Sequence, residues 1–444
     1  MRFYIDTLGC QKNTVDSEAL HSSLLAAGHC VASSAEDADV MVVNTCGFID
    51  VAKQQSIDHL LKLGAVKKDG QLLIAAGCLS QRYAEELRAE LPEVDALVGV
   101  DAWKYVPSLL ATRPRGKSRL PVLPVLPPGA AGFPVVPRVA TGPSADIKIS
   151  EGCNYGCTFC AIPIMKGKFR SKPLQSIVVE ARQLVAAGVK EAILVSQDST
   201  AYGMDQRNGT DLGTLLDALA NEVPELPWVR VMYMHPDRLN HKLIQRLPAF
   251  ATFCHYIDIP VQHAHPDVLR RMHRGGHPER TEELLLALRA SLPDIALRTS
   301  FIVGFPGETD EEYEALVSWT KKMKFDHAGV FTYSPEDGTP GADMPDHVTR
   351  SVKNKRRQRL MRVQERISSA RNARLQGQSL TVLIEGNNAS FEQRDEPPVS
   401  VGRSYRDAPE VDGTVIIQGH HTVGAMLEVR VTGSTSHDLI GTPA

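Results

Sequence analysis

The order of apolar and polar stretches divides the chain into regions of different character. Residues 1–110 alternate short apolar runs with helical segments, and residues 144–345 repeat a strand-then-helix order six times. A basic helical stretch at 350–375 precedes residues 379–444, where short alternating strands are separated by Gly and Asn turns. Alternating strands and helices predict parallel sheets, and closely spaced short strands predict an antiparallel barrel. We therefore expect an α/β multidomain chain with an N-terminal open parallel α/β sheet, a central partial (β/α)6 barrel and a small C-terminal antiparallel β-barrel.

These regions give the predicted domain boundaries. The N-terminal domain is expected at 1–110, the central domain at 144–375 and the C-terminal barrel at 376–444. A length of 444 residues agrees with about three domains of ~150 residues each. Residues 111–143 hold eight prolines and few helix formers, which predicts an extended, semi-rigid linker. These prolines are Pro114, Pro121, Pro124, Pro127, Pro128, Pro134, Pro137 and Pro143.

Three predicted strands of the N-terminal domain each end near a cysteine that adjoins a glycine. The apolar runs are 2–8, 40–43 and 72–76, and the cysteines are Cys10, Cys46 and Cys78. Because the carboxyl ends of parallel strands share one edge of a sheet, we expect the three thiols to converge. The adjacent glycines let the backbone approach a bulky inorganic group. The alternative is three small buried cysteines that happen to follow strands.

Two smaller features of the sequence carry further expectations. Asn13 is a predicted N-cap of a helix that Gly28 ends. Cys30 and Cys254 lack a neighbouring glycine and a strand-end position, so we interpret both as small buried hydrophobic residues.

A second group of three thiols stands in a single loop. Cys153, Cys157 and Cys160 have the spacing C-x3-C-x2-C and follow a strand-like run at 146–150. Thiolates ligate iron–sulfur clusters, so three of them can hold three irons of a cubane and leave the fourth open to a ligand outside the protein. The alternatives are a zinc site or buried apolar thiols. A zinc site needs a fourth Cys or His, and the following thirty residues hold neither.

Charge and composition narrow the class of partner. The net charge of −3 gives the whole chain no basic nucleic-acid footprint. No apolar run is long enough to span a bilayer, and no secretory signal precedes the strand that begins at Phe3. We therefore expect a cytoplasmic protein whose eight cysteines serve metal binding or catalysis and not disulfides.

Two stretches carry an excess of one sign of charge, although the net charge of the whole chain is small. Residues 350–375 are strongly basic, which fits either a nucleic-acid or membrane patch or a solvated helix face. From residue 379 on, nine acidic side chains oppose four basic ones. Phosphate-backbone binding depends on Lys and Arg, so the C-terminal barrel is expected to be a poor RNA binder and to suit a basic protein partner.

The cysteine loop, with an aromatic residue before its last cysteine, resembles the signature of the radical S-adenosylmethionine (SAM) enzymes. Nearly the whole chain resembles the methylthiotransferase family of these enzymes, which ends in a barrel called TRAM, and within it the RimO type. The similar segments are 13–18 (NTVDSE), 44–50 (NTCGFID), 196–198 (SQD), 236–238 (PDR), 258–263 (DIPVQH), 331–336 (FTYSPE), 402–404 (GRS) and 407–410 (DAPE). One departure is Gln11, where RimO-type chains usually carry proline and tRNA-modifying relatives carry glutamine. Lys12 and the acidic barrel agree with the RimO type.

The resemblance implies two [4Fe-4S] clusters and SAM as cofactors. Cys10, Cys46 and Cys78 would hold an auxiliary cluster, and Cys153, Cys157 and Cys160 would hold the catalytic cluster that binds SAM. It also implies that two SAM molecules are consumed, one to methylate a sulfur and one to yield a 5′-deoxyadenosyl radical. The substrate would be the β-carbon of one aspartate in the small-subunit ribosomal protein twelve, and an electron donor would act as a further partner.

Five other residues are expected to contact SAM. Phe159 would lie against the adenine, Gly304 and Gly307 would let the backbone approach the adenosine, and Ser196 and Gln197 would make polar contacts. The alternatives are ordinary packing of Phe159, a tight strand-to-helix turn at the glycines and a plain strand-end turn at Ser196. Four histidines suggest a metal site as an alternative, but we expect surface or packing roles for them: His263, His265, His273 and His277.

Two other functions stay open at this point. A tRNA methylthiotransferase would use the same scaffold, but its barrel should be basic. A non-catalytic iron–sulfur electron-transfer protein would cleave no SAM under reduction, and six strand–helix units with an open-iron loop argue against it.

Overall fold

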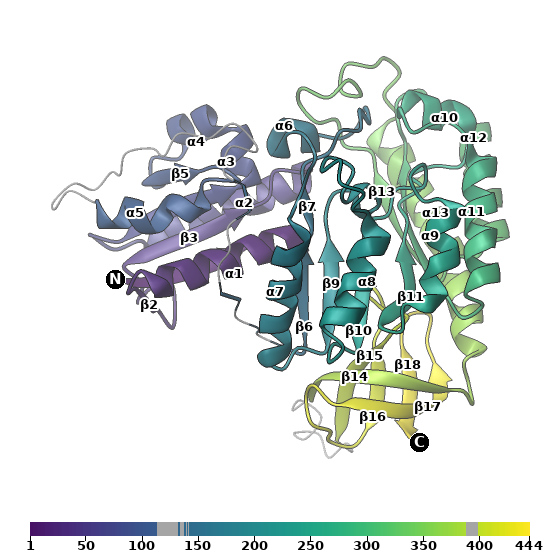
Figure 1. Ribbon diagram of the computed structural model, residues 1–444. Coiled ribbons are helices and arrows are strands. Elements are labelled where there is room, and N and C mark those ends of the chain that lie inside the picture. Colours follow the sequence, from purple (N-terminus) through teal and green to yellow (C-terminus); the bar gives the residue numbers. More distant parts are fainter. Residues whose placement is uncertain (113–131, 134–136, 139, 141, 388–397) are drawn as a thin grey trace.

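The computed structural model describes residues 1–112, 132–133, 137–138, 140, 142–387 and 398–444. The chain forms an N-terminal sheet beside a larger central sheet, and a C-terminal barrel lies against one end of the central sheet (Figure 1). These three parts confirm the fold class expected from the hydrophobic pattern. Most of the predicted proline-rich linker lies outside the described residues.

The N-terminal sheet has the strand order β2-β1-β3-β4-β5, and all its neighbouring strands are parallel. Its strands are β1 (Arg2–Thr7), β2 (Cys30–Val31), β3 (Val40–Thr45), β4 (Leu72–Gly77) and β5 (Ala96–Val98). Its helices are α1 (Gln11–Ala26), α2 (Asp50–Val66), α3 (Cys78–Arg82), α4 (Ala84–Glu90) and α5 (Val106–Ala111), with a 3-10 turn at Trp103–Tyr105. Apolar residues of α1 and α5 cover one face, and those of α2 and α4 cover the other. Burial on both faces explains why β3 and β4 are continuous apolar runs.

Two expectations for this region are wrong. Helix α1 begins at Gln11 with Cys10 as its N-cap, three residues before the predicted cap Asn13. The side-chain amide of Asn13 instead donates to the carbonyls of Leu8, at 2.8 Å, and Thr45, at 3.2 Å, and so ties two strand ends together. Cys30 is exposed, because β2 is a two-residue strand at the edge of the sheet, whereas Cys254 is buried as expected.

The central sheet is open and has the order β13-β12-β11-β10-β9-β6, with all neighbouring strands parallel. Its strands are β6 (Ser144–Lys148), β9 (Glu191–Val195), β10 (Trp228–Val231), β11 (Phe253–Asp258), β12 (Ala296–Val303) and β13 (His327–Thr332). The helices are α6 (Ile162–Lys166), α7 (Leu174–Ala186), α8 (Leu212–Glu222), α9 (His241–Arg246), α10 (Pro266–Arg271), α11 (Pro278–Ser291), α12 (Asp310–Met323) and α13 (Arg350–Ala373), with 3-10 turns at Ser199–Ala201 and Leu247–Ala249. Strands β7 (Ser150–Glu151) and β8 (Arg170–Ser171) form a short antiparallel pair beside the cysteine loop. All six predicted strands overlap an observed one.

The inner face of the central sheet packs against both other parts of the chain. One buried apolar group contains Val15 of α1, Val195 of β9, Tyr256 of β11 and Ala408 of the C-terminal barrel. Helix α1 of the N-terminal domain and the C-terminal barrel thus both contribute to the buried surface of the central sheet. Among the described helices, none combines the length and apolar character that crossing a bilayer requires.

The C-terminal barrel is closed by five strands in the order β14-β15-β16-β18-β17. They are β14 (Ser379–Asn387), β15 (Val399–Ser404), β16 (Val415–Gln418), β17 (Met426–Ser434) and β18 (Leu439–Pro443). Four neighbouring pairs are antiparallel, as expected, and the pair β16–β18 that completes the circle is parallel.

Candidate active site

The first three thiols lie at the carboxyl ends of three adjacent strands, β1, β3 and β4. Their loops touch through glycines. A Cβ on Gly9 would lie 2.7 Å from Cβ and 3.0 Å from Sγ of Cys46, and a Cβ on Gly47 would lie 2.9 Å from the backbone of Leu79, the residue after Cys78. No larger residue fits at either place, so the glycines are what allow these cysteine loops to pack together. The structure thus brings Cys10, Cys46 and Cys78 into one site.

Burial dominates the electrostatics of Cys46 and Cys78 in this first triad. Burial raises the pKa of Cys46, and it raises that of Cys78 to about 12. The ammonium of Lys166 acts in the opposite direction on both thiols, and negative charge on Cys10 adds to the increase. A bound cation that replaces the protons removes the cost of a buried thiolate, so the site is suited to metal.

The second triad occupies the loop between β7 and α6. Gly152, at φ +78°, enters this loop, and a Cβ there would collide with the carbonyl oxygen of Lys168. The backbone N–H of Cys153 donates to Gly167, and that of Cys160 donates to Cys157, both at 3.1 Å. The loop therefore has a fixed course that holds its three sulfurs on one short segment.

Burial also dominates the electrostatics of the second triad. It raises the pKa of Cys153 and Cys157, and it raises that of Cys160 to about 12. The guanidinium of Arg274 lies 4.0 Å from Sγ of Cys157 and acts in the opposite direction on this thiol. Among the described residues, Arg274 is the positively charged side chain that a hydrogen bond places against a cysteine of this loop.

The spacing of the sulfurs in both triads does not match the geometry of one ion held by three thiolates. Among the described residues, one group of three ligand atoms lies within 4.8 Å of one another, and it contains no cysteine. Thiolates around one zinc ion, at Zn–S distances of ~2.3 Å, lie roughly 4 Å apart. Each triad is wider than that, as expected where each thiolate binds a different iron of one cluster.

A buried charge network connects the two triads. Lys166 lies 3.1 Å from Glu151, and Lys148 lies 2.6 Å from both Glu151 and Asp16. Burial raises the pKa of Glu151, but the two lysines outweigh it and hold that pKa well below its usual range. The sequence interpretation gave these residues no role. The signal that could have found them is Lys148, which stands between the apolar Ile147 and Ile149 in the run that leads into the cysteine loop.

Ser196 and Gln197 follow β9 at the mouth of the barrel, and both make contacts within the protein. The hydroxyl of Ser196 is bonded to that of Ser199 at 2.9 Å, and its carbonyl accepts from Lys12 at 3.2 Å. The amide of Gln197 donates to Glu151 at 3.2 Å, while its buried oxygen has no partner among the described residues. Gln197 therefore keeps a free acceptor at the site, and the Ser196 side chain does not.

The other predicted SAM contacts lie on the loop and on the turn after β12. Phe159 is half-buried against a cluster that includes Phe305 and Tyr333. Gly304 and Gly307 have φ near +70°, and the N–H of Gly304 donates to the Glu308 carboxylate at 2.6 Å. The turn geometry alone accounts for both glycines, so their contact with SAM stays a prediction.

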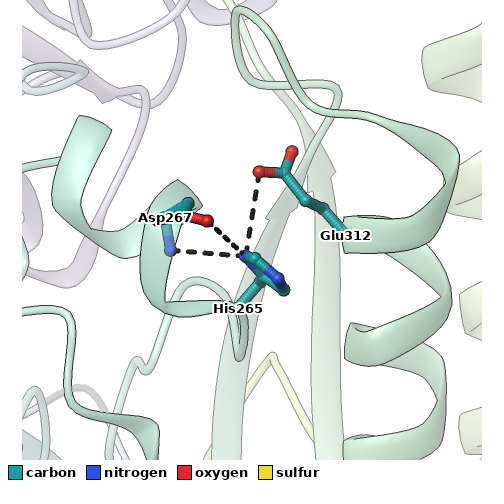
Figure 2. Close-up of side chains that lie close together, drawn as sticks. All are labelled: His265, Asp267 and Glu312. Carbon is teal, nitrogen blue, oxygen red and sulfur yellow. Dashed lines mark hydrogen bonds and ion pairs between the residues drawn. The ribbon is translucent and has the colours of Figure 1, made fainter.

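The group without cysteine is His265, Asp267 and Glu312, whose carboxylates point toward Nδ1 of the histidine (Figure 2). These oxygens lie 3.9 and 3.7 Å from Nδ1, which accepts the backbone N–H of Asp267 at 3.3 Å as the cap of α10. Glu312 accepts from Arg271 at 2.7 Å. The three side chains therefore already serve a helix end and an ion pair, in agreement with the packing role expected for His265.

Three family models match the chain in succession. They are an uncharacterized protein family, UPF0004, at residues 2–99, the Radical SAM superfamily at 147–320, and the TRAM domain at 377–443. The first contains one thiol triad, and the second contains the other.

Curated relatives match over almost their whole length. A protein of Roseiflexus sp. (strain RS-1) is 44% identical over 460 residues, covering 99% of this chain and 97% of the relative. One of Chloroflexus aurantiacus is 43% identical and covers 99% of both, and one of Geobacter sulfurreducens is 41% identical and covers 98% and 97%. All three are named ribosomal protein uS12 methylthiotransferase RimO.

Solved structures share the fold at low identity. The radical SAM methyltransferase TsrM from Kitasatospora setae, with cobalamin and a [4Fe-4S] cluster bound, has a TM-score of 0.57 at 15% identity and covers 77% of each chain. The cobalamin-dependent radical SAM enzyme OxsB has a TM-score of 0.51 at 12% identity and covers 82% of this chain and 56% of its own.

Proposed function

This chain belongs to the RimO-type methylthiotransferases of the radical SAM enzymes, and from that membership we propose that it inserts a methylthio group at the β-carbon of an aspartate residue of ribosomal protein uS12. Full-length identity of 41–44% to relatives of that name supports the substrate. The observation that carries the chemistry is the pair of separate three-thiol sites joined by one buried charge network.

The residues fit two [4Fe-4S] clusters and SAM. Each site offers three thiols, no fourth cysteine, and a spacing too wide for one ion. Cys10, Cys46 and Cys78 would hold the auxiliary cluster, and Cys153, Cys157 and Cys160 the cluster that binds SAM. When bound, these groups supply an electron for SAM cleavage, the resulting carbon radical, and the sulfur to be transferred.

The chain's own residues would position these groups. Gly9, Gly47 and Gly152 let backbone segments close around the thiols. Lys166 and Arg274 supply positive charge beside the first and second triads, which offsets the thiolates that binding would create. Phe159, Ser196, Gln197, Gly304 and Gly307 remain the residues that we assign to SAM.

The C-terminal barrel favours a protein partner over RNA. Two of its four arginines, Arg403 and Arg406, are buried and paired with Glu191 and Asp326 of the central domain. They are therefore not available to phosphates. We propose that the barrel helps to receive the basic protein uS12, free or on the ribosome, in the cytoplasm, and that a separate donor supplies electrons.

The test compares uS12 with tRNA as substrates. The protein is reconstituted anaerobically with iron and sulfide, then incubated with SAM, a reductant and either substrate. Mass spectrometry of uS12 peptides should show one aspartate peptide in which a methylthio group replaces a hydrogen, and tRNA should stay unmodified. Modified tRNA with unmodified uS12 would establish the tRNA enzyme, and absence of SAM cleavage would establish the electron carrier.

A further inference from the structure

Lys12 is exceptional among the buried cations of the described residues. Nine Lys and Arg residues are buried there, and eight of them have a carboxylate oxygen within 4.0 Å. The eight are Arg138, Lys148, Lys166, Lys172, Arg230, Arg356, Arg403 and Arg406. Lys12 is 8% exposed and has no such partner in the described part of the chain.

The contacts of Lys12 leave its ammonium incompletely satisfied. Its Nζ donates to the carbonyl of Ser196 at 3.2 Å and lies 3.6 Å from the centroid of the Tyr233 ring. An ammonium group has three donors, and a buried charge is costly unless it is paired. A carbonyl and a ring face offer partial charges only, and no carboxylate oxygen of the described residues touches the ammonium. The charges of Glu151 and Asp146 act on Lys12 from a greater distance.

Lys12 lies where the two thiol sites meet. It is in the first turn of α1, two residues after Cys10, and its two contacts follow β9 and β10 at the mouth of the central barrel. The hydroxyl of Tyr233 donates to the neighbouring Gln11 at 3.3 Å. Gln197, the residue after Ser196, contacts Glu151 two residues before Cys153. A short chain of contacts thus runs from the first triad past Lys12 to the second.

The backbone of Tyr233 is held in an unusual conformation at this place. Its φ is +60°, which is uncommon for a residue other than glycine, and its N–H donates to Asp258 at 3.2 Å. Such strain persists where the surroundings fix it, and it is concentrated at functional sites. Here it places the aromatic ring beneath the ammonium of Lys12.

We propose that Lys12, supported by Tyr233, is a subsite for the side-chain carboxylate of the substrate aspartate. This inference rests on the proposed function, in which the reacting carbon is bonded to that carboxyl group. An aspartate that enters a buried site brings one carboxylate, which is the direct partner that Lys12 lacks among the described residues. Pairing the two would fix the β-carbon between the thiol sites and select aspartate over asparagine.

The experiment measures binding affinity for two forms of uS12, so it reports the preference for aspartate and does not depend on activity. Reconstituted wild-type protein and Lys12→Met are titrated with labelled uS12, carrying either the native target aspartate or its Asn replacement. Loss of a buried charge pair should weaken binding of native uS12 about tenfold or more. Binding of the Asn form should be nearly equal in the two proteins, and the affinity for SAM should be unchanged.

Lys53→Met is the matched control. Lys53 also crosses from the N-terminal domain to the central one, but it is paired with Glu336 at 3.1 Å. Its replacement should affect both forms of uS12 equally. Lys12→Arg keeps the charge and should retain part of the preference for aspartate. This variant also keeps the test decisive if Lys12→Met does not fold.

Three outcomes would overturn the subsite. These are equal loss of binding for both forms of uS12, no loss for either, or a loss of affinity for SAM, which would assign Lys12 to the SAM carboxylate. The proposed function fails separately, if wild-type protein does not modify native uS12.

Discussion

The ammonium of Lys166 lies 3.1 Å from Oε1 of Glu151, and this contact joins the two thiol sites. Glu151 stands two residues before Cys153, whereas Lys166 lowers the pKa of Cys46 and Cys78 against the effect of burial. One buried ion pair thus belongs to both sites. The relative position of the two triads is fixed by side chains that neither triad contains.

Lys166→Met should destabilise the protein, because it leaves Glu151 and Asp16 with Lys148 as their shared cation. Breaking a buried ion pair typically costs about 3 kcal/mol or more of unfolding free energy. Urea unfolding of the apo-protein measures this loss. Lys68→Met is the control, since Lys68 is exposed and should change the free energy by less than about 0.5 kcal/mol. Equal effects of the two substitutions would refute a structural role for the network.

Gly9→Ala should abolish the first cluster. The new methyl group would lie 2.7 Å from Cβ of Cys46, so this side chain must move away from Cys10. Iron content after anaerobic reconstitution should fall by half, from about eight to about four atoms per chain.

Gly28→Ala separates crowding from backbone strain. Gly28 also has a positive φ, +82°, but nothing lies within 4 Å of the added Cβ. Backbone strain should lower the unfolding free energy of Gly9→Ala and of Gly28→Ala by about 1 kcal/mol each. Gly28→Ala should nevertheless retain all its iron. Normal iron in Gly9→Ala would show that the first triad tolerates displacement of Cys46.

Acid should weaken the contact between the barrel and the central sheet. Burial raises the pKa of Glu191, but Arg230 and Arg403 outweigh it and lower that pKa from 4.5 to about 2. A depressed carboxyl pKa stabilises the fold above pH 4.5, and this contribution is lost as pH falls toward 2. The unfolding free energies of wild type and Glu191→Gln should therefore differ by about 3 kcal/mol at neutral pH and converge in acid. A difference independent of pH would contradict this account.

The parts of the fold that local pattern determines were predictable from the sequence. The six central strands were predictable because each is a short stretch with several apolar or β-branched residues that polar residues follow. The cysteines after β1, β3 and β4 could be placed together because parallel strands end at one edge. Strands β2 and β5 were missed because two or three residues carry no periodicity. The cap of α1 was misplaced because Asn13 bonds to Leu8 and Thr45, and the latter is distant in sequence.

The charges around the site were not predictable. Lys12, Lys166 and Glu151 take their roles from partners up to 184 residues away, such as Ser196 for Lys12. No local pattern distinguishes a lysine that is buried and paired from one on the surface. Only the packing of the N-terminal domain against the central one shows that Lys12 is buried and has no carboxylate partner among the described residues.

The measurement that tests the central claim most directly is an iron count on the triple variant Cys10→Ala/Cys46→Ala/Cys78→Ala. Wild type and variant are reconstituted anaerobically, and iron and SAM cleavage under reduction are measured on the same samples. Two independent clusters predict about eight irons in wild type and about four in the variant, with SAM cleavage retained in both. About four irons in both proteins would mean that the N-terminal thiols hold no cluster, and the methylthiotransferase mechanism would lose its sulfur-bearing site.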